Sequence, residues 1–298
     1  MVATAHRLIG LVTQTPLHAG AGSATEVIDL PIQREAHTDW PCVFGSSMKG
    51  ALRAAAESYD ALDKERITTL FGPDTANASE HAGNLLVSDA RLLLLPVRSL
   101  TGHYRWVTCP ALLRRLMRDA QRCGVMWSAP SIPTIEEGEA WVLQHKGEGN
   151  TLFLEEFSFS TRTDSDGLTP WLTLLNDLLD DRKEELHDQL TLVDDASFRH
   201  LCRSAIPVQP HIRIKNETKT VADGALWYEE NISPDTLFYW TLTAQPSRNA
   251  KDEGAPDAML ESLLSTLFPV NKAWLQVGGN ETVGMGWCQV KEVRNGQV

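Results

Sequence analysis

Residues 16–53 read PLHAGAGSATEVIDLPIQREAHTDWPCVFGSSMKGALR. A loop of small residues leads to a single acid, Asp29, whose stiff apolar neighbours should fix its position. The stretch ends in Gly45-Ser46-Ser47, a pattern typical of a helix start, where unpaired backbone N–H groups and the helix dipole favour an anion. The sequence therefore predicts one carboxylate held near a site for an anion, and phosphate is an anion that fits.

The helix that follows has a cationic face. Ser46 and Ser47 are both suitable N-cap residues, and Lys49 and Arg53 stand one turn apart on the same face. The spacing is not that of a Walker motif, because the pattern GxxxxGK[ST] is missing. An ordinary capped amphipathic helix explains the same residues, so this segment alone leaves both interpretations open.

Asp29 and His18 are the candidate catalytic groups of the loop. A lone carboxylate can bind a hard divalent cation together with water, and such a cation stabilises phosphoryl charge or helps to deprotonate an attacking hydroxyl. A histidine titrates near neutral pH and can act as a general acid or base. The structural alternatives are an aspartate that caps a backbone N–H and a histidine that only packs.

Two further segments lie in the second half of the chain. Residues 211–228 read HIRIKNETKTVADGALWY, and Arg213 and Lys215 make the first arm of this predicted hairpin basic. A protruding basic hairpin can follow phosphates and wedge apolar side chains between bases, although a sheet-edge hairpin has the same pattern. Residues 278–286, GGNETVGMG, form a glycine-rich turn that allows close approach to a phosphate chain, as any tight hairpin turn would.

The composition indicates a globular protein. With 298 residues, of which 42% are hydrophobic, the chain can bury the core of one large domain or two ordinary ones. No apolar run approaches the roughly 20 residues that span a bilayer, and the N-terminus lacks the layout of a signal peptide. We therefore expect a cytoplasmic protein without a membrane partner. Five cysteines, an odd number with no CxxC pair, indicate reduced thiols and no zinc site.

Charge is distributed unevenly along the chain. The net charge of −12 argues against a free-standing nucleic-acid binder. Residues 84–128, however, contain seven arginines against two aspartates, a net of +5, whereas residues 164–195 contain ten acids against two basic residues, a net of −8. This predicts a basic face for an anionic partner and suits head-to-tail stacking of copies, with scattered surface charge as the alternative.

Strand and helix patterns alternate irregularly. This favours an α+β fold with a mixed or antiparallel sheet over a doubly wound parallel sheet. The clearest predicted strands cover 7–14, 85–97, 104–109 and 237–244. Helices are predicted after Ser47 and over 63–70, 110–122, 170–188 and 256–267.

Taken together and in this order, five blocks of the chain resemble one known family. They are the loop TPLHAGAGSATEVIDLPIQREAHTDWP (15–41), the helix start GSSMKGALR (45–53), the strand LVSDARLLLLPVRSLTGHYRWVTCP (86–110), the hairpin HIRIKNETKTVADGALWYEENI (211–232) and the turn LQVGGNETVGMGW (275–287). The family is that of the fourth subunit of the Cmr complex, the backbone subunit of type III-B CRISPR effectors, within the RAMP superfamily. The resemblance covers nearly the whole chain in scattered blocks.

The resemblance implies a fold and an assembly. The fold would be a ferredoxin-like, RRM-related palm in a single RAMP domain over 1–298, with a protruding thumb hairpin at 205–232, and we expect an acidic helical insertion at 164–204. Copies would stack as a filament along a CRISPR guide RNA beside other Cmr subunits, and each thumb would disrupt the guide–target duplex at regular intervals. There the subunit would cut single-stranded target RNA as an endoribonuclease dependent on a divalent metal, Mg²⁺ or Mn²⁺. The nucleophile would be the 2′-hydroxyl of the target RNA.

The resemblance also assigns residues. The catalytic aspartate of the family falls on Asp29 within VIDLPIQRE, and this residue is also the implied metal ligand. The loop histidine falls on His18, an acid after the hairpin matches Glu229 or Glu230 with both registers open, and Asp89 matches an acid of unclear role. RNA-binding positions are expected at Gln33, Arg34, Ser46, Ser47, Lys49, Arg53, Arg213, Lys215, Gly278, Gly279 and Gly284.

Three other functions compete with this one. The main alternative is a non-catalytic RNA-binding scaffold subunit of a CRISPR effector complex, and the presence of Asp29 in its full motif favours the nuclease. A second is a RAMP endonuclease that processes precursor guide RNA alone. A third is an unrelated metabolic α+β enzyme that binds a nucleotide at the glycine-rich turn.

Overall fold

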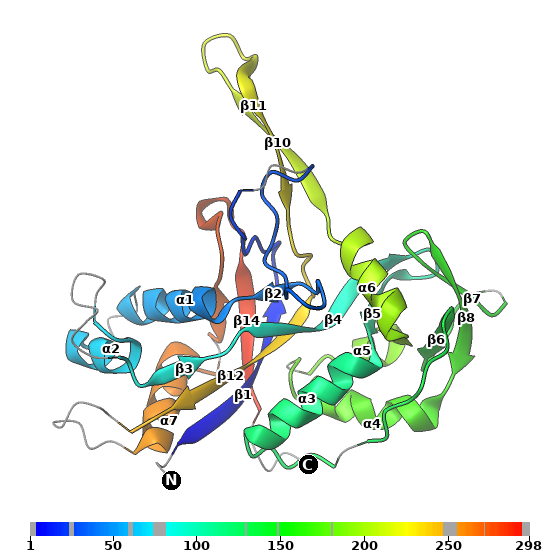
Figure 1. Ribbon diagram of the computed structural model, residues 1–298, viewed down its shortest axis with the longest axis horizontal. Helices are drawn as coiled ribbons and strands as arrows, with labels where there is room; N and C mark the ends of the chain where they lie inside the picture. Colours follow the sequence, from blue (N-terminus) through cyan, green and yellow to red (C-terminus); the bar gives the residue numbers. More distant parts are fainter. Residues whose placement is uncertain are drawn as a thin grey trace.

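Four antiparallel strands form the centre of the fold, in the spatial order β14–β1–β12–β4 (Figure 1). They are β14 (Trp287–Glu292), β1 (Ala5–Thr13), β12 (Leu237–Ala244) and β4 (Ala90–Ser99). β1 pairs with β12 on one side and with β14 on the other, and β12 pairs with β4. The computed structural model describes residues 4–23, 27–58, 62–73, 82–128, 130–147, 149–179, 181–246, 255–270 and 272–293.

Two helices connect these strands. α1 (Gly45–Ser58) lies in the chain between β1 and β4, and α7 (Pro256–Leu267) lies between β12 and β14. The buried side chains of α1 include Met48 and Leu52, four residues apart, which is the spacing of one helix face. Most residues of β1 and β12 are buried whichever side they face, because helices or further chain cover both sides of the sheet.

The sheet continues beyond β4 into a second layer of shorter strands, drawn to the right in Figure 1. These are β5 (His103–Thr108), β9 (Leu190–Val193), β6 (Glu139–Val142), β8 (Phe157–Thr163) and β7 (Thr151–Leu154). Three short strands, β2 (Cys42–Val43), β3 (Leu85–Val87) and β13 (Trp274–Gln276), add to β4, β12 and β14. Because β5–β9 and β6–β8 are parallel while the central pairs are antiparallel, the predicted mixed α+β fold is confirmed.

The remaining helices are α2 (Lys64–Phe71), α3 (Pro110–Arg122), α4 (Ser165–Asn176), α5 (Lys183–Gln189) and α6 (Asp195–Ser204). The expected single helix over 170–188 is wrong, since the chain forms α4 and α5 there. Leu178 lies between the two helices and Leu186 lies on α5, and both are completely buried. Asp181, between α4 and α5, has a left-handed backbone conformation (φ 65°), which an α-helix cannot continue through.

A two-stranded hairpin projects from the body (Figure 1). It consists of β10 (Val208–Ile214) and β11 (Val221–Glu230), which pair with each other and with no other named strand in the described part of the chain. Ile212 and Leu226 are about half exposed on it, at 50% and 54%. An isolated two-stranded ribbon is only marginally stable, so the attachment at its base determines its position.

The cysteines are all free thiols, and four of the five are buried. Within the described residues, no helix is both long enough and apolar enough to cross a membrane.

Candidate functional site

Segments far apart in the sequence meet at the base of the hairpin. The Leu30 amide donates to the Tyr228 carbonyl (3.0 Å), and the Glu230 amide donates to the Leu30 carbonyl (3.0 Å). Just beyond β11, Leu17 and Ile232 exchange two main-chain hydrogen bonds of 2.9 Å each. The end of β11 is thereby bound to two parts of the long loop, the stretch at residues 17–18 and the stretch that carries Asp29.

Asp29 is half-buried in this loop. Its Oδ2 atom accepts a hydrogen bond from the Tyr228 amide (2.8 Å), whereas Oδ1 has no hydrogen-bond partner among the described residues. The predicted capping role and the predicted ligand role are therefore compatible. One oxygen anchors the carboxylate to the base of the hairpin, and the other can face a ligand.

His18 is held in one orientation next to the same strand. Its Nδ1 atom lies 2.9 Å from the Glu230 carbonyl oxygen. Because a carbonyl only accepts, Nδ1 carries the proton, and the neutral ring keeps a lone pair on Nε2. A Cβ atom at Gly20 would lie 2.8 Å from this Nε2, so the glycine leaves room for the ring.

The glycine-rich turn packs against His18. The Gly279 amide donates to the His18 carbonyl (2.9 Å). Gly278 has φ = +82°, and a Cβ atom there would lie 2.3 Å from the same carbonyl oxygen. Gly284, at φ = +85°, has nothing within 4 Å of its would-be Cβ. Of the glycines predicted to contact RNA, Gly278 and Gly279 thus support the histidine, while Gly284 shapes the turn after the short 3₁₀ helix at Glu281–Val283.

Glu229 and Glu230 are both buried, but they face opposite sides because neighbours on a strand alternate. The Glu229 carboxylate accepts from Asn280 Nδ2 (2.7 Å), on the side of the glycine-rich turn, and lies 4.0 Å from His211 Nε2. The Glu230 carboxylate faces the other way and forms a short ion pair with Arg34. Glu229 is thus the acid on the side where the glycine-rich turn supports His18.

Sequence reasoning missed Asn280 and His211. Asn280 has a left-handed backbone conformation (φ 61°), which asparagine tolerates better than most residues. The glycines around it indicate a tight turn at this position. The His211 ring stacks on Trp227 with centroids 5.5 Å apart. Neither contact with Glu229 has a local sequence signal, because the partners are many residues apart in the chain.

The start of α1 differs from the expectation that Ser46 or Ser47 caps it. The helix begins at Gly45, and the Gly45 amide donates to the Asp89 carboxylate (2.7 Å), which gives Asp89 a role as a cap. This happens because a carboxylate from a neighbouring part of the sheet satisfies the free amide and complements the helix dipole. The same negative charge makes this helix start less suitable for phosphate than the sequence predicts.

Gln33 connects the loop to α1 through hydrogen bonds. Its side-chain oxygen accepts from the Phe44 amide (2.6 Å), and its side-chain nitrogen donates to Ser47 Oγ and to the Gly20 carbonyl (3.0 Å each). Gln33 is buried, at 6% exposure, so its contacts are internal to the protein. Ser46, in contrast, is exposed in the first turn.

The cations predicted to bind RNA divide into two groups. Arg34 and Arg53 make internal contacts, with Arg53 bonded to Glu57 (2.8 Å) and to the Gly72 carbonyl (3.1 Å). Lys49 is half-buried and forms no ion pair with a described residue, and burial, with a contribution from Arg53, lowers its pKa. Arg213 is exposed on the projecting hairpin, as is Lys215 just beyond β10.

The site fits an ion bound mainly by water and substrate. Among the described residues, no group of three or more histidines, cysteines or acids could hold a metal ion. Mg²⁺ usually keeps several waters and is bound by one or two carboxylates together with phosphate oxygens. Asp29, with one unpaired oxygen, suits that kind of ion and does not suit a closed zinc-type cage.

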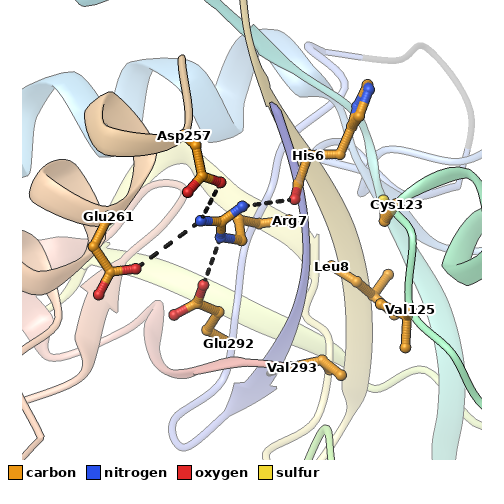
Figure 2. Close-up of a pocket in the computed structure, with 9 residues that line it drawn as sticks. All are labelled: His6, Arg7, Leu8, Cys123, Val125, Asp257, Glu261, Glu292 and Val293. Atoms are coloured by element: carbon orange, nitrogen blue, oxygen red, sulfur yellow. Dashed lines mark hydrogen bonds and ion pairs between the residues drawn. The ribbon is translucent and has the colours of Figure 1, made fainter. Parts of the chain in front are cut away.

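A separate cavity of about 320 Å³ lies where α7 meets the start of β1, far from the hairpin (Figures 1 and 2). The Arg7 side chain lies in it and bonds to Glu292 (2.8 Å), to Asp257 (2.9 Å) and to the His6 carbonyl (3.0 Å). Figure 2 shows that these partners surround the guanidinium from β1, α7 and β14. These ion pairs join β1, α7 and β14 beside the cavity, and the Asp257 side chain is exposed there.

Comparisons with known proteins concern the chain as a whole. A family model described as the RAMP superfamily matches residues 11–289. A relative from Pyrococcus furiosus named CRISPR system Cmr endoribonuclease Cmr4 is 38% identical over 292 residues, which cover 97% of this chain and 96% of the relative. A relative from Saccharolobus solfataricus named CRISPR system CMR subunit Cmr4 is 26% identical and covers 93% of each chain.

Solved structures show the same fold. A crystal structure described as oligomeric Cmr4 from Pyrococcus furiosus superposes with a TM-score of 0.74 at 32% identity, covering 97% of this chain and 99% of that one. A cryo-EM structure described as the type III-B Cmr-beta complex bound to cognate target RNA gives a TM-score of 0.74 at 19% identity, covering 98% and 99%, and this likeness concerns the fold alone. The chain therefore belongs to the RAMP superfamily and, within it, to the Cmr4 family.

Proposed function

We propose that this chain is a backbone subunit of a type III-B CRISPR effector complex and an endoribonuclease that cuts bound target RNA at regular intervals. The observation that carries the proposal is the gathering of Asp29 and His18 at the base of a projecting hairpin, on a chain 38% identical to a protein named as a Cmr endoribonuclease. Its partners are the guide RNA, the target RNA, copies of itself and other Cmr subunits, in the cytoplasm.

In this proposal the body is a ferredoxin-like palm and the β10–β11 hairpin is the thumb. The strand order β14–β1–β12–β4, with α1 and α7 as crossover helices, supports the palm assignment. Half-exposed Ile212 and Leu226 support the thumb assignment, because apolar side chains on a projecting hairpin can separate stacked nucleotides. A nucleotide splayed by the thumb would leave the regular duplex next to Asp29.

The reaction starts from the 2′-hydroxyl of the target RNA. Its oxygen attacks the neighbouring phosphorus, the bond from phosphorus to the 5′-oxygen breaks, and a cyclic 2′,3′-phosphate and a 5′-hydroxyl result. The free Nε2 of His18 takes the proton of the 2′-hydroxyl, and the leaving 5′-oxygen takes a proton from water. Asp29 would hold the divalent cation, Mg²⁺ or Mn²⁺, which supplies positive charge beside the phosphate oxygens when bound.

The decisive experiment is target cleavage by the reconstituted complex with Asp29→Asn. Asparagine can still accept the hydrogen bond from the Tyr228 amide, so the loop should keep its place while the charge is lost. We expect cleavage to fall by at least about 100-fold with assembly and RNA binding unchanged. Asp39→Asn, in a surface pair with Arg203, is the matched control and should cut normally.

The outcomes separate the candidates. Normal cutting by Asp29→Asn would remove Asp29 from the mechanism. A wild-type complex that binds target RNA but does not cut it with Mg²⁺ or Mn²⁺ would support the scaffold function instead. Cutting of repeat RNA by the isolated chain would support guide processing, and we expect none.

A further inference from the structure

The Glu230 carboxylate is bound to the loop that carries Asp29. Glu230 is 3% exposed, its Oε2 accepts from the Ile32 amide (3.0 Å), and its Oε1 pairs with Arg34. Its own amide donates to the Leu30 carbonyl (3.0 Å). One residue at the end of the hairpin thus contacts three alternate residues of the loop, immediately after Asp29.

Arg34 extends this connection to α6, the helix that precedes the first strand of the hairpin. Its guanidinium donates to the Asp39 carbonyl (2.9 Å) and to the Cys202 carbonyl (3.0 Å) as well as to Glu230. Cys202 lies near the end of α6, which leads directly into β10, and Glu230 is the last residue of β11. A single, mostly buried side chain therefore links the loop, the helix that leads into the hairpin and the last residue of β11.

The chemistry of the pair suits positioning. Ion pairs that replace apolar packing in a protein interior add little net stability, because desolvation offsets their attraction. A guanidinium, however, has donors in fixed directions, and each bond it makes restricts the angle of the next. Glu230 has both of its oxygens engaged by Arg34 and Ile32, so it has little capacity left for RNA or a metal.

We propose that Arg34 and Glu230 are positioning residues that fix Asp29 relative to the hairpin and so determine which phosphodiester bond is cut. The inference rests on the proposed function. The hairpin selects the nucleotide that leaves the duplex. Cutting at a single bond therefore requires Asp29 to keep a constant distance from the hairpin. Of the two acids at the end of β11, Glu229 then lies on the catalytic side and Glu230 acts through the loop.

The test uses the reconstituted complex and end-labelled target RNA under single-turnover conditions. Arg34→Gln and Glu230→Gln should each slow cutting by about 100-fold, since a displacement of about 1 Å costs that much. Part of the product should move to neighbouring bonds, and the pH profile should keep its shape. The double variant Arg34→Gln/Glu230→Gln leaves no unpaired buried charge, so it should recover at least about 10-fold of the lost rate.

Two control variants accompany this test. Arg203→Gln breaks the exposed pair with Asp39 (2.6 Å), which joins the same loop to the same helix α6, and should leave rate and product lengths unchanged. Arg34→Lys keeps the buried positive charge but loses the guanidinium with its donors in fixed directions. It should therefore give products of several lengths even if the neutral variants do not assemble.

Several results would overturn the proposal. One is a single product length formed at the wild-type rate by Arg34→Lys or by Glu230→Gln. Another is a Glu230→Gln complex whose cleavage rate loses one limb of its pH profile and whose rate does not rise again in the double variant. Hydrogen exchange of the Leu30 and Ile32 amides tests the pair without any cleavage. Faster exchange in Arg34→Gln supports the pair and unchanged exchange refutes it, even if the wild-type complex proves not to cut RNA.

Discussion

Gly278→Ala gives a direct measure of how the glycine-rich turn supports His18. Gly278 lies in the left-handed region at φ = +82°, and a Cβ atom would lie 2.3 Å from the His18 carbonyl oxygen and 2.9 Å from its carbon. Both contacts are with main chain, so no side-chain rotation can relieve them. The turn must move away from His18, and the hydrogen bond from the Gly279 amide to the same carbonyl must lengthen or break.

The cost can be estimated from its parts. A residue with a side chain in the left-handed region costs about 1–2 kcal/mol. Loss of one internal hydrogen bond adds about 0.5–1.5 kcal/mol. With the residual steric contact we expect the free energy of unfolding to fall by about 2–4 kcal/mol. Gly284→Ala has the same backbone problem at φ = +85° with nothing within 4 Å of its Cβ, so it should lose only about 1–2 kcal/mol.

Two assays distinguish the variants. Urea unfolding of the isolated chain measures the difference in stability between Gly278→Ala and Gly284→Ala. Single-turnover cleavage by the complex measures the displacement of His18, and only Gly278→Ala should slow it, by roughly 100-fold. Equal losses of stability and equal cleavage rates for the two variants would refute the reasoning, because the contact with His18 is what separates them.

Two further predictions concern pH and salt. Burial raises the pKa of Cys288 from 9.0 to about 12, so between these values the unfolded chain loses a proton that the folded chain keeps, and stability falls as pH rises. This thiol should lower the free energy of unfolding by about 1.4 kcal/mol at pH 10. Urea unfolding measures the fall in this free energy between pH 8 and pH 10, and the fall should be smaller by that amount in Cys288→Ala than in the wild type. Lys49→Gln should weaken RNA binding by the complex and reduce the slope of log affinity against log salt by roughly 0.7 for each phosphate that Lys49 neutralises. An unchanged slope would show that Lys49 does not bind phosphate.

The secondary structure follows from local pattern where burial is periodic. The stripe of Met48 and Leu52 predicts α1, and the structure buries both residues. Pro110 predicts the start of α3, and the structure places it at the first helical position. The helix predicted over 256–267 has the same bounds in the structure. In each case the signal lies within a few residues, since one face of the element must be apolar.

The details of the site have no such signal. Asp89 caps α1 from 44 residues away, and Asn280 reaches Glu229 across 51 residues. The pairing of Arg34 with Glu230 spans 196 residues. Sequence spacing cannot show which polar side chains the fold brings together, so it left the register of Glu229 and Glu230 open and assigned Ser46 or Ser47 to a cap that Asp89 provides. Asp29 and His18 are candidates both from the chemistry of the loop residues and from the family resemblance, and their catalytic roles stay predictions.

The distribution of cations explains how an acidic chain of net charge −12 can work on RNA. Arg34 and Arg53 make contacts within the protein. Near the loop, Lys49 forms no ion pair with a described residue and can contact RNA. One copy should therefore bind RNA weakly, and a stack of copies along one guide would combine many weak contacts into high affinity. Catalysis and binding then depend on different residues. That separation is why loss of the Asp29 charge should stop cutting while the assembled complex keeps its RNA.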